Sequence, residues 1–151
     1  MPSQAKRGFT TTSSAVRTLE TAHLIGQKCG CDNQVIAVDE FYLAEPDIYI
    51  NFLKTLPDDL ERVMVIGHNP GLESLLQILS RQIEPLPTAV LAHISLPIKS
   101  WKELTNEIEG ELIDLWRPKE LPEDLFEKET EKKPKEKKVK EEKPKKKSAK
   151  K

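Results

Sequence analysis

The sequence predicts an α/β domain with a mainly parallel sheet, followed by a charged tail. Short apolar runs typical of strands alternate along the first 121 residues with segments whose apolar residues recur at helical spacing. The run at residues 62–66 has no polar alternation, which is typical of a strand buried on both faces. The chain of 151 residues is long enough for one domain with a sizeable core.

The first elements are predicted to be a short strand and a long helix. Residues 9–12 are aromatic or β-branched, as in a strand. Ser13 or Ser14 is a candidate N-cap for a helix over residues 15–29, which Gly30 would end. The expected buried face of this helix holds Val16, Leu19, Ala22 and Leu24 or Ile25.

The middle of the chain continues the alternation. Residues 35–38 form a strand-like apolar run, and Pro46 suits the first turn of a second helix. Residues 57–59 have turn chemistry and lead into the strand at 62–66. The buried side of the second helix is expected to hold Ile48, Phe52, Leu53 and Leu56.

A third helix and two further strands complete the predicted domain. The helix covers residues 71–79, and the strands cover 89–96 and 112–116, with a short helix or turn at 101–107 between them. The last strand is ended by Arg117 and Pro118. The third helix is expected to point four leucines inward: Leu72, Leu75, Leu76 and Leu79.

The charge of the chain divides it into an acidic body and a basic tail. Residues 127–151 hold thirteen lysines and six glutamates, a net charge of +7, whereas the remainder holds 11 basic and 19 acidic residues, a net charge of −8. We expect residues 122–151 to be disordered, residues 13–121 to form the domain, and residues 1–12 to be an N-terminus that is either irregular or a remnant. The tail is expected to be solubilising, with weak contacts to nucleic acid as the alternative, since no aromatic side chain is present to stack on bases.

Several classes of protein are excluded by composition. No run of about eighteen apolar residues indicates a membrane span, and the N-terminus lacks the apolar region of a secretory signal. Cys29 and Cys31 are too close in sequence for an ordinary disulfide, so we expect two reduced thiols in a cytoplasmic protein. One nearby histidine, His23, does not complete a metal site with them.

The segment Gly67-His68-Asn69-Pro70-Gly71 lies between the buried strand and the third helix. In open α/β sheets, ligands bind beyond the carboxyl ends of the strands, and a helix N-terminus there favours anions. His68 could therefore hydrogen-bond a phosphoryl oxygen or transfer a proton. A histidine that only fills the corner and caps the helix is an equally good interpretation of this motif alone.

Arg17 shifts the balance towards a phosphate site. It lies one turn inside the first helix, after another predicted strand end, where an arginine can hold phosphate bidentately. The alternative is an exposed arginine that pairs with Glu20 or Thr21 on the same helix.

At this point the sequence resembles the histidine phosphatase superfamily. Residues 13–22, SSAVRTLETA, are similar to its Ser-Pro-Ala-x-Arg-x-x-x-Thr-Ala segment, and residues 63–71, VMVIGHNPG, to its second-histidine segment. The Asn-Pro-Gly ending resembles the small phosphohistidine phosphatases of the SixA type. Residues 86–89, Trp101 and residues 117–119 also resemble that subgroup.

The resemblance implies a three-layer phosphoglycerate-mutase-like fold and a phosphatase that needs no metal or other cofactor. It implies that Arg17 and His68 bind the phosphoryl group, with His68 acting in catalysis by stabilising the transferring group. The implied substrates are a phosphohistidine protein or a small phosphoester.

The family's attacking histidine lies in an Arg-His-Gly motif on a first, central strand, which this sequence does not contain. His23 and His93 do not replace it, since one lies on the first helix and the other in the middle of a strand. We therefore expect an N-terminally truncated domain whose neighbouring strands lack a partner, with poor or marginal stability.

Three hypotheses follow from this departure. The chain is a phosphatase whose start lies further upstream, a module that binds phosphoryl groups without cleaving them, or a decayed fragment without activity. A nucleic-acid-associated protein is a less favoured alternative, because no helix-turn-helix, zinc spacing or aromatic platform is present.

Overall fold

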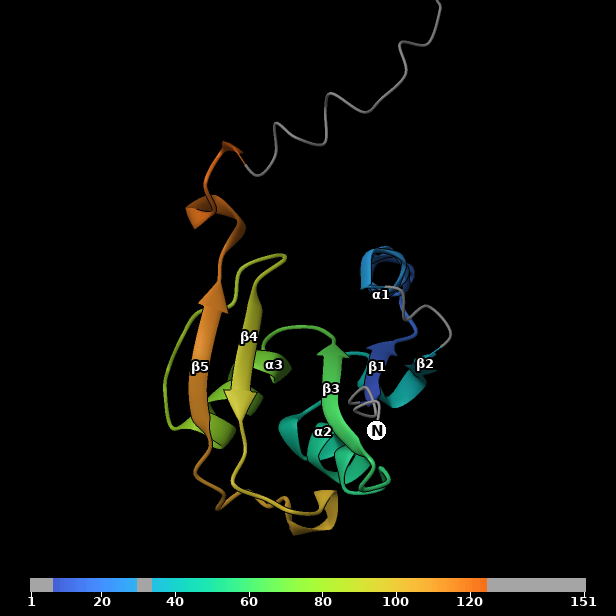
Figure 1. The fold of residues 1–151 in the computed structure, drawn as a ribbon, viewed down its shortest axis with the longest axis vertical. Helices are drawn as coiled ribbons and strands as arrows, with labels where there is room; N and C mark the ends of the chain where they lie inside the picture. Colours follow the sequence, from blue (N-terminus) through green and yellow to red (C-terminus); the bar gives the residue numbers. More distant parts are fainter. Residues whose placement is uncertain (1–6, 30–33, 125–151) are drawn as a thin grey trace, which may run out of the picture. The chain divides into compact units, whose positions relative to one another are not determined.

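The computed structural model describes residues 7–29 and 34–124 (Figure 1). The chain divides into one unit of Met1–Lys119 and a second of Glu120–Lys151. All elements discussed below belong to the first unit. Gly30 and most of the predicted tail lie outside the described residues. The strands and helices are β1 (Arg7–Ser13), α1 (Val16–Cys29), β2 (Val35–Val38), α2 (Pro46–Leu53), β3 (Leu60–Ile66), α3 (Gly71–Ser80), β4 (Leu91–Ser95) and β5 (Glu111–Trp116).

The described residues form two separate sheets. β1 lies between β2 and β3 in a parallel three-stranded sheet, whereas β4 and β5 form an antiparallel pair. In Figure 1 the β4–β5 pair lies beside β3, and the arrows of β3 and β4 point in opposite directions. The predicted alternation of strands and helices and the parallel pairing are therefore confirmed, with β4 and β5 as the antiparallel exception.

Helices cover both faces of the parallel sheet. Phe9 of β1 and Val63 and Val65 of β3 pack against a core that α2 and α3 share. Because side chains alternate along a strand, Thr10 and Thr12 lie on the opposite face of β1, where α1 contacts the strand. The layers are therefore α1, the sheet, and the α2–α3 pair.

The buried faces of α1 and α2 differ from the prediction. Val16 and Leu24 are 71% and 64% exposed, and α1 instead buries a row of small residues at four-residue spacing. On α2, Ile48 is exposed, Phe52 is partly buried, and Tyr49 and Ile50 take the inner positions beside Leu53. The small residues that α1 buries are Thr18, Ala22 and Gly26.

The third helix agrees with the prediction. Leu75, Leu76 and Leu79 of α3 are buried, and Leu72 packs partly buried against the same core. The predicted turn at residues 57–59 is present, and a 3₁₀ helix covers Trp101–Glu103 within the segment predicted as a short helix or turn. The indole N–H of Trp101 donates to the carbonyl of Leu60 at 2.7 Å, which fixes this segment to the start of β3.

β3 is not buried on both faces. Its residues from Val63 to Ile66 are only partly buried, because β3 pairs with β1 alone among the described residues and forms the edge of their sheet. A cavity of about 680 Å³ lies along the other side of β3 and is also lined by β4. The prediction of a fully buried strand was therefore wrong for this structure.

None of the helices that the structure describes combines the length and the apolar character needed to cross a membrane.

Candidate phosphate-binding site

The site is built where β1 and β3 end side by side. The two strands pair in parallel, with Thr12 opposite Ile66, so the residues that follow both strands meet at one edge of the sheet. Ser13 is the last residue of β1, and Arg17 lies in the first turn of α1. His68 follows β3 after Gly67 and precedes α3.

Arg17 and Ser13 hold the two nitrogens of the His68 ring. The Arg17 guanidinium lies 2.9 Å from Nδ1 of His68, and the Ser13 hydroxyl lies 2.8 Å from Nε2. A guanidinium only donates hydrogen bonds, so Nδ1 is the acceptor, and Nε2 carries the proton and donates it to Ser13 Oγ. The geometry therefore selects the neutral ring with its proton on Nε2.

Burial and charge both favour this neutral ring. His68 is 7% exposed and Ser13 is fully buried. Burial, and secondly the positive charge of Arg17, lower the pKa of His68 from its usual 6.5. Among the residues that the structure describes, no carboxylate forms an ion pair with Arg17. The site thus presents one uncompensated positive charge beside a neutral imidazole.

The lowered pKa of His68 predicts a pH-dependent stability. The unfolded chain protonates this histidine more readily than the folded one, so its contribution is complete above pH 6.5 and is lost as the pH falls towards the folded pKa. We expect the melting temperature to decrease over this window, and to decrease less in His68→Gln. Melting curves of both proteins measured between about pH 5 and 7.5 test this; parallel curves would contradict it.

A glycine-lined corner places the backbone of His68. The hydroxyl of Tyr49 accepts a hydrogen bond from the backbone N–H of His68 and donates to the carbonyl of Phe41 at 3.3 Å. A Cβ at Gly67 would lie 2.4 Å from the Tyr49 hydroxyl oxygen, so only glycine lets the tyrosine approach this closely. Burial raises the pKa of Tyr49 above 10.0.

The rim of the site is formed by Tyr42 and by the loop after α3. The Tyr42 ring meets the His68 ring edge-on, with centroids 5.4 Å apart, and is 56% exposed. Asn69 donates to the carbonyl of Leu86 and to the carboxylate of Glu73 at 3.2 Å, and Glu73 accepts from the Leu86 N–H at 2.8 Å. These bonds tie the loop to the beginning of α3.

The structure brings together both residues that the sequence singled out, Arg17 and His68. Their assigned roles in binding and catalysis stay a prediction. His23 is exposed on α1, and His93 lies in β4, stacked on Trp116 with ring centroids 6.5 Å apart.

Sequence reasoning missed two neighbours of His68, namely Ser13 and Tyr42. The sequence predicts Ser13 as a candidate helix cap and as the first residue of the segment 13–22, and its hydroxyl does accept from the N–H of Ala15 at 3.4 Å. Across residues 7–29 and 34–124, no three His, Cys, Asp or Glu side chains come together in a way that could hold a metal ion.

Comparison with known proteins identifies a likeness of fold. No protein-family model matches the sequence, and no curated protein matches it. The structure matches that of a protein from Nakamurella multipartitia that is assigned as the phosphohistidine phosphatase SixA, with a TM-score of 0.59 and 24% sequence identity. The match covers 76% of this chain and 72% of that one. At this identity the likeness concerns the fold, and it confirms the predicted mixed α/β, phosphoglycerate-mutase-like class.

Proposed function

We propose that this chain is a homologue of the SixA-type phosphohistidine phosphatases and binds a phosphoryl group at the site that Arg17 and His68 form. The observation that carries the proposal is the pairing of these two side chains at 2.9 Å, at the ends of adjacent parallel strands. The likeness of fold supports it, since the matched protein is named for that activity. The proposed ligand is a phosphohistidine protein or a small phosphoester.

The chemistry of the pair suits a phosphoryl group. Arg17 offers a planar fork of N–H donors and a positive charge without a carboxylate partner among the described residues. A bound phosphoryl dianion would favour the protonated form of His68, since a nearby negative charge raises the pKa of an imidazole. Binding is therefore expected to be coupled to the uptake of a proton at Nδ1 of His68, which replaces the hydrogen bond that Nδ1 accepts from Arg17 in the free protein.

In this proposal Arg17 and His68 stabilise charge and do not attack phosphorus. Stabilising the equatorial oxygens of a transferring phosphoryl group is the main task of a protein in this reaction. The family's attacking histidine belongs to an Arg-His-Gly motif, and none of the three histidines of this sequence lies in such a motif. We therefore propose that the 151 residues alone bind phosphoryl groups with little or no hydrolysis.

The test is a titration with inorganic phosphate, followed by NMR of the protein's backbone and histidine signals. We expect saturable shifts at Ser13, Arg17 and His68, with a downfield change of the ring C–H signals of His68 that reports its protonation. A parallel assay with a phosphorylated histidine protein is expected to show no release of phosphate. If the NMR shifts are spread evenly over the basic side chains and do not saturate at His68, the proposal of a phosphate site is wrong. If the phosphorylated histidine protein is rapidly hydrolysed, only the proposal that the chain lacks catalysis is wrong.

A further inference from the structure

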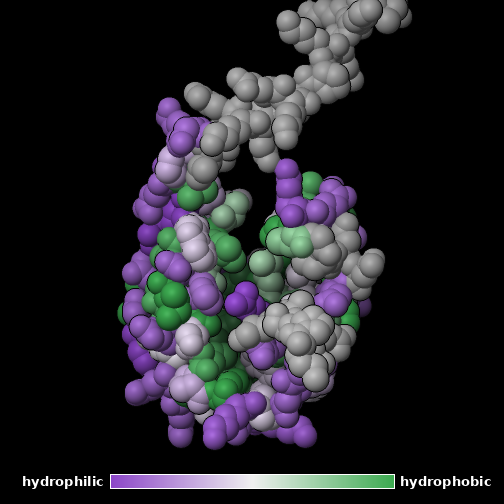
Figure 2. Space-filling model, in the orientation of Figure 1, coloured by the Kyte–Doolittle hydropathy of each residue, from purple (hydrophilic) through white to green (hydrophobic). Residues whose placement is uncertain are grey.

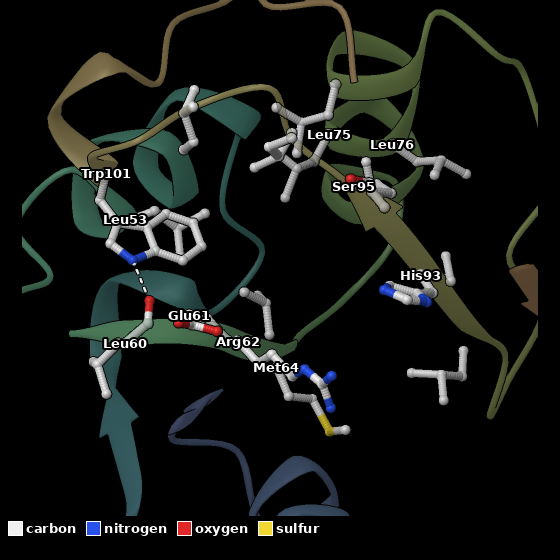
Figure 3. A pocket seen from close by; sticks show the side chains of 18 of the residues that line it. Leu53, Leu60, Glu61, Arg62, Met64, Leu75, Leu76, His93, Ser95 and Trp101 are labelled. Atoms are coloured by element: carbon white, nitrogen blue, oxygen red, sulfur yellow. Dashed lines mark hydrogen bonds between the residues drawn. The ribbon is translucent and has the colours of Figure 1, made fainter. Parts of the chain in front are cut away.

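The rim beside His68 is separate from the cavity along β3. Leucines of α2 and α3, such as Leu53, Leu75 and Leu76, line that cavity together with β3 and β4 (Figure 3), and Figure 2 shows hydrophobic side chains around the hollow. Of the described residues that line it, none is Arg17, Tyr42 or His68. A ligand of the proposed phosphate site therefore meets other side chains, which are those of the rim.

The ring of His68 is open to a ligand on the side of Arg17 and Tyr42. Ser13, Arg17 and Tyr42 each contact this ring, and Ser13 is fully buried whereas Arg17 and Tyr42 are exposed. The centroids of the Tyr42 and His68 rings are 5.4 Å apart, yet Tyr42 is 56% exposed. A ligand that reaches His68 from solvent therefore meets a guanidinium and an aromatic ring.

The backbone around Tyr42 fixes the place of its ring. The preceding residue, Phe41, is fully buried, and Ala44 is buried with its carbonyl so close to Gly71 that no Cβ has room there. Leu43 lies between them with a positive φ of 49°, which a non-glycine residue keeps only where the surrounding structure enforces it. Tyr42 is therefore held in position before a ligand binds, and a ring held in this way loses little conformational entropy on binding.

We propose that Tyr42 is a specificity-determining residue, which selects phosphoryl groups that are carried on a planar ring. The inference rests on the proposed phosphate site, since Arg17 and His68 bind the phosphoryl group and the ring attached to it packs on Tyr42. Aromatic rings attract each other at centroid distances of about 4.5 to 7 Å, and a ring bonded to phosphorus directly or through one oxygen stays close to the site. Phosphorylated imidazole and phenol rings share this chemistry, whereas an alkyl ester has no aromatic face.

The hydroxyl of Tyr42 offers a different contact, a hydrogen bond to a phosphoryl oxygen. Such a bond would strengthen the binding of every phosphoryl compound equally, whatever group carries the phosphoryl. Tyr42→Phe removes the hydroxyl and keeps the ring, and Tyr42→Leu removes both and keeps an apolar side chain. The two variants therefore separate the ring contact from the hydrogen bond.

The probes are inorganic phosphate, phenyl phosphate, cyclohexyl phosphate and N-phosphoimidazole, each titrated into the full chain. Phenyl and cyclohexyl phosphate have rings of similar size and carry the same charge at about pH 8, above the second pKa of about 6 of a phosphate monoester. NMR of the His68 ring signals gives the dissociation constants, and nuclear Overhauser contacts between the phenyl protons and Tyr42 report the ring contact. The tighter of the two planar ligands distinguishes a ring bonded through nitrogen from one bonded through oxygen.

We expect the parent chain to bind phenyl phosphate and N-phosphoimidazole about 3- to 10-fold more tightly than cyclohexyl phosphate, the contribution of one aromatic pair. The preference should persist in Tyr42→Phe and disappear in Tyr42→Leu. Both variants should bind inorganic phosphate as the parent chain does, because the phosphoryl group is held by Arg17 and His68.

Four results would overturn the role of Tyr42 and leave the phosphate site in place. They are equal binding of planar and cyclohexyl ligands by the parent chain, a preference that survives in Tyr42→Leu, a preference that is lost in Tyr42→Phe, and an equal loss of inorganic phosphate and ester binding in Tyr42→Leu. The last result would mean that Tyr42 only positions His68. If inorganic phosphate leaves the His68 signals of the parent chain unchanged, the phosphate site itself is wrong and the inference fails with it.

Discussion

Replacing Arg17 by alanine is expected to weaken phosphate binding by about 10- to 100-fold, the equivalent of one charge-assisted hydrogen-bond pair. Arg17 lies on the surface of α1 and bonds to His68 through one nitrogen, so its remaining donors are open to an anion. The variant should still fold, with a modest loss of stability, because it leaves Nδ1 of the buried His68 without its donor. Removing its charge should also raise the pKa of His68, since that charge is one of the two causes that lower it.

Arg62→Ala is the matched control for this variant. Arg62 pairs with Gly8 at the opposite end of the β1–β3 ladder from Ser13, so its loss changes the net charge equally without touching the site. Calorimetric titration with phosphate is expected to separate the two variants, and Arg17→Lys should fall between them because it keeps the charge but not the fork. Equal losses in Arg17→Ala and Arg62→Ala would show that net charge, and not the Arg17–His68 pair, binds the anion.

The meeting of Arg17 and His68 could be predicted from the sequence because it depends on backbone topology. Each follows a strand-like segment, and parallel pairing of neighbouring strands brings their carboxyl ends to one edge. Tyr42 could not be found in this way. Its place beside His68 depends on a loop in which Leu43 adopts a positive φ of 49°, and no pattern of apolar residues encodes such a loop.

The errors in the helix faces have a common physical cause. Hydrophobic periodicity selects large apolar residues, whereas α1 meets the sheet through Thr18, Ala22 and Gly26. Small side chains let the helix approach the sheet closely. The buried hydroxyl of Thr18 has a hydrogen-bond partner, since it donates to the carbonyl of Ser13 at 2.8 Å. Tyr49 is likewise fully buried because its hydroxyl finds two backbone partners.

The apolar run of β3 was correctly identified as a strand, but its burial was not. A run of this kind predicts cover on both faces and pairing at both edges, and the described residues supply a partner on one edge only. The apolar sequence of β3 thus predicts a partner strand on both of its edges, and the described residues provide one on the β1 side.

Gly71→Ala is expected to be the most destabilising conservative change near the site, by about 2 to 4 kcal/mol of the free energy of unfolding. Gly71 begins α3, and a Cβ there would lie 2.0 Å from the backbone carbonyl oxygen of Ala44. A backbone atom cannot rotate away as a side chain can, so α3 must move from the segment before α2. Since His68 immediately precedes this helix and its carbonyl accepts from the N–H of Leu72 at 3.1 Å, the shift should also weaken phosphate binding.

Gly8→Ala provides the same chemical change without the clash. No atom lies within 4 Å of the position that a Cβ would take at Gly8, and alanine reduces the freedom of the unfolded chain, so this variant should be neutral or slightly stabilising. Urea unfolding of the two variants beside the parent chain measures the difference. If the Gly71→Ala protein is as stable as the Gly8→Ala protein, α3 does not approach Ala44 this closely. The claim that this close packing positions His68 would then be wrong.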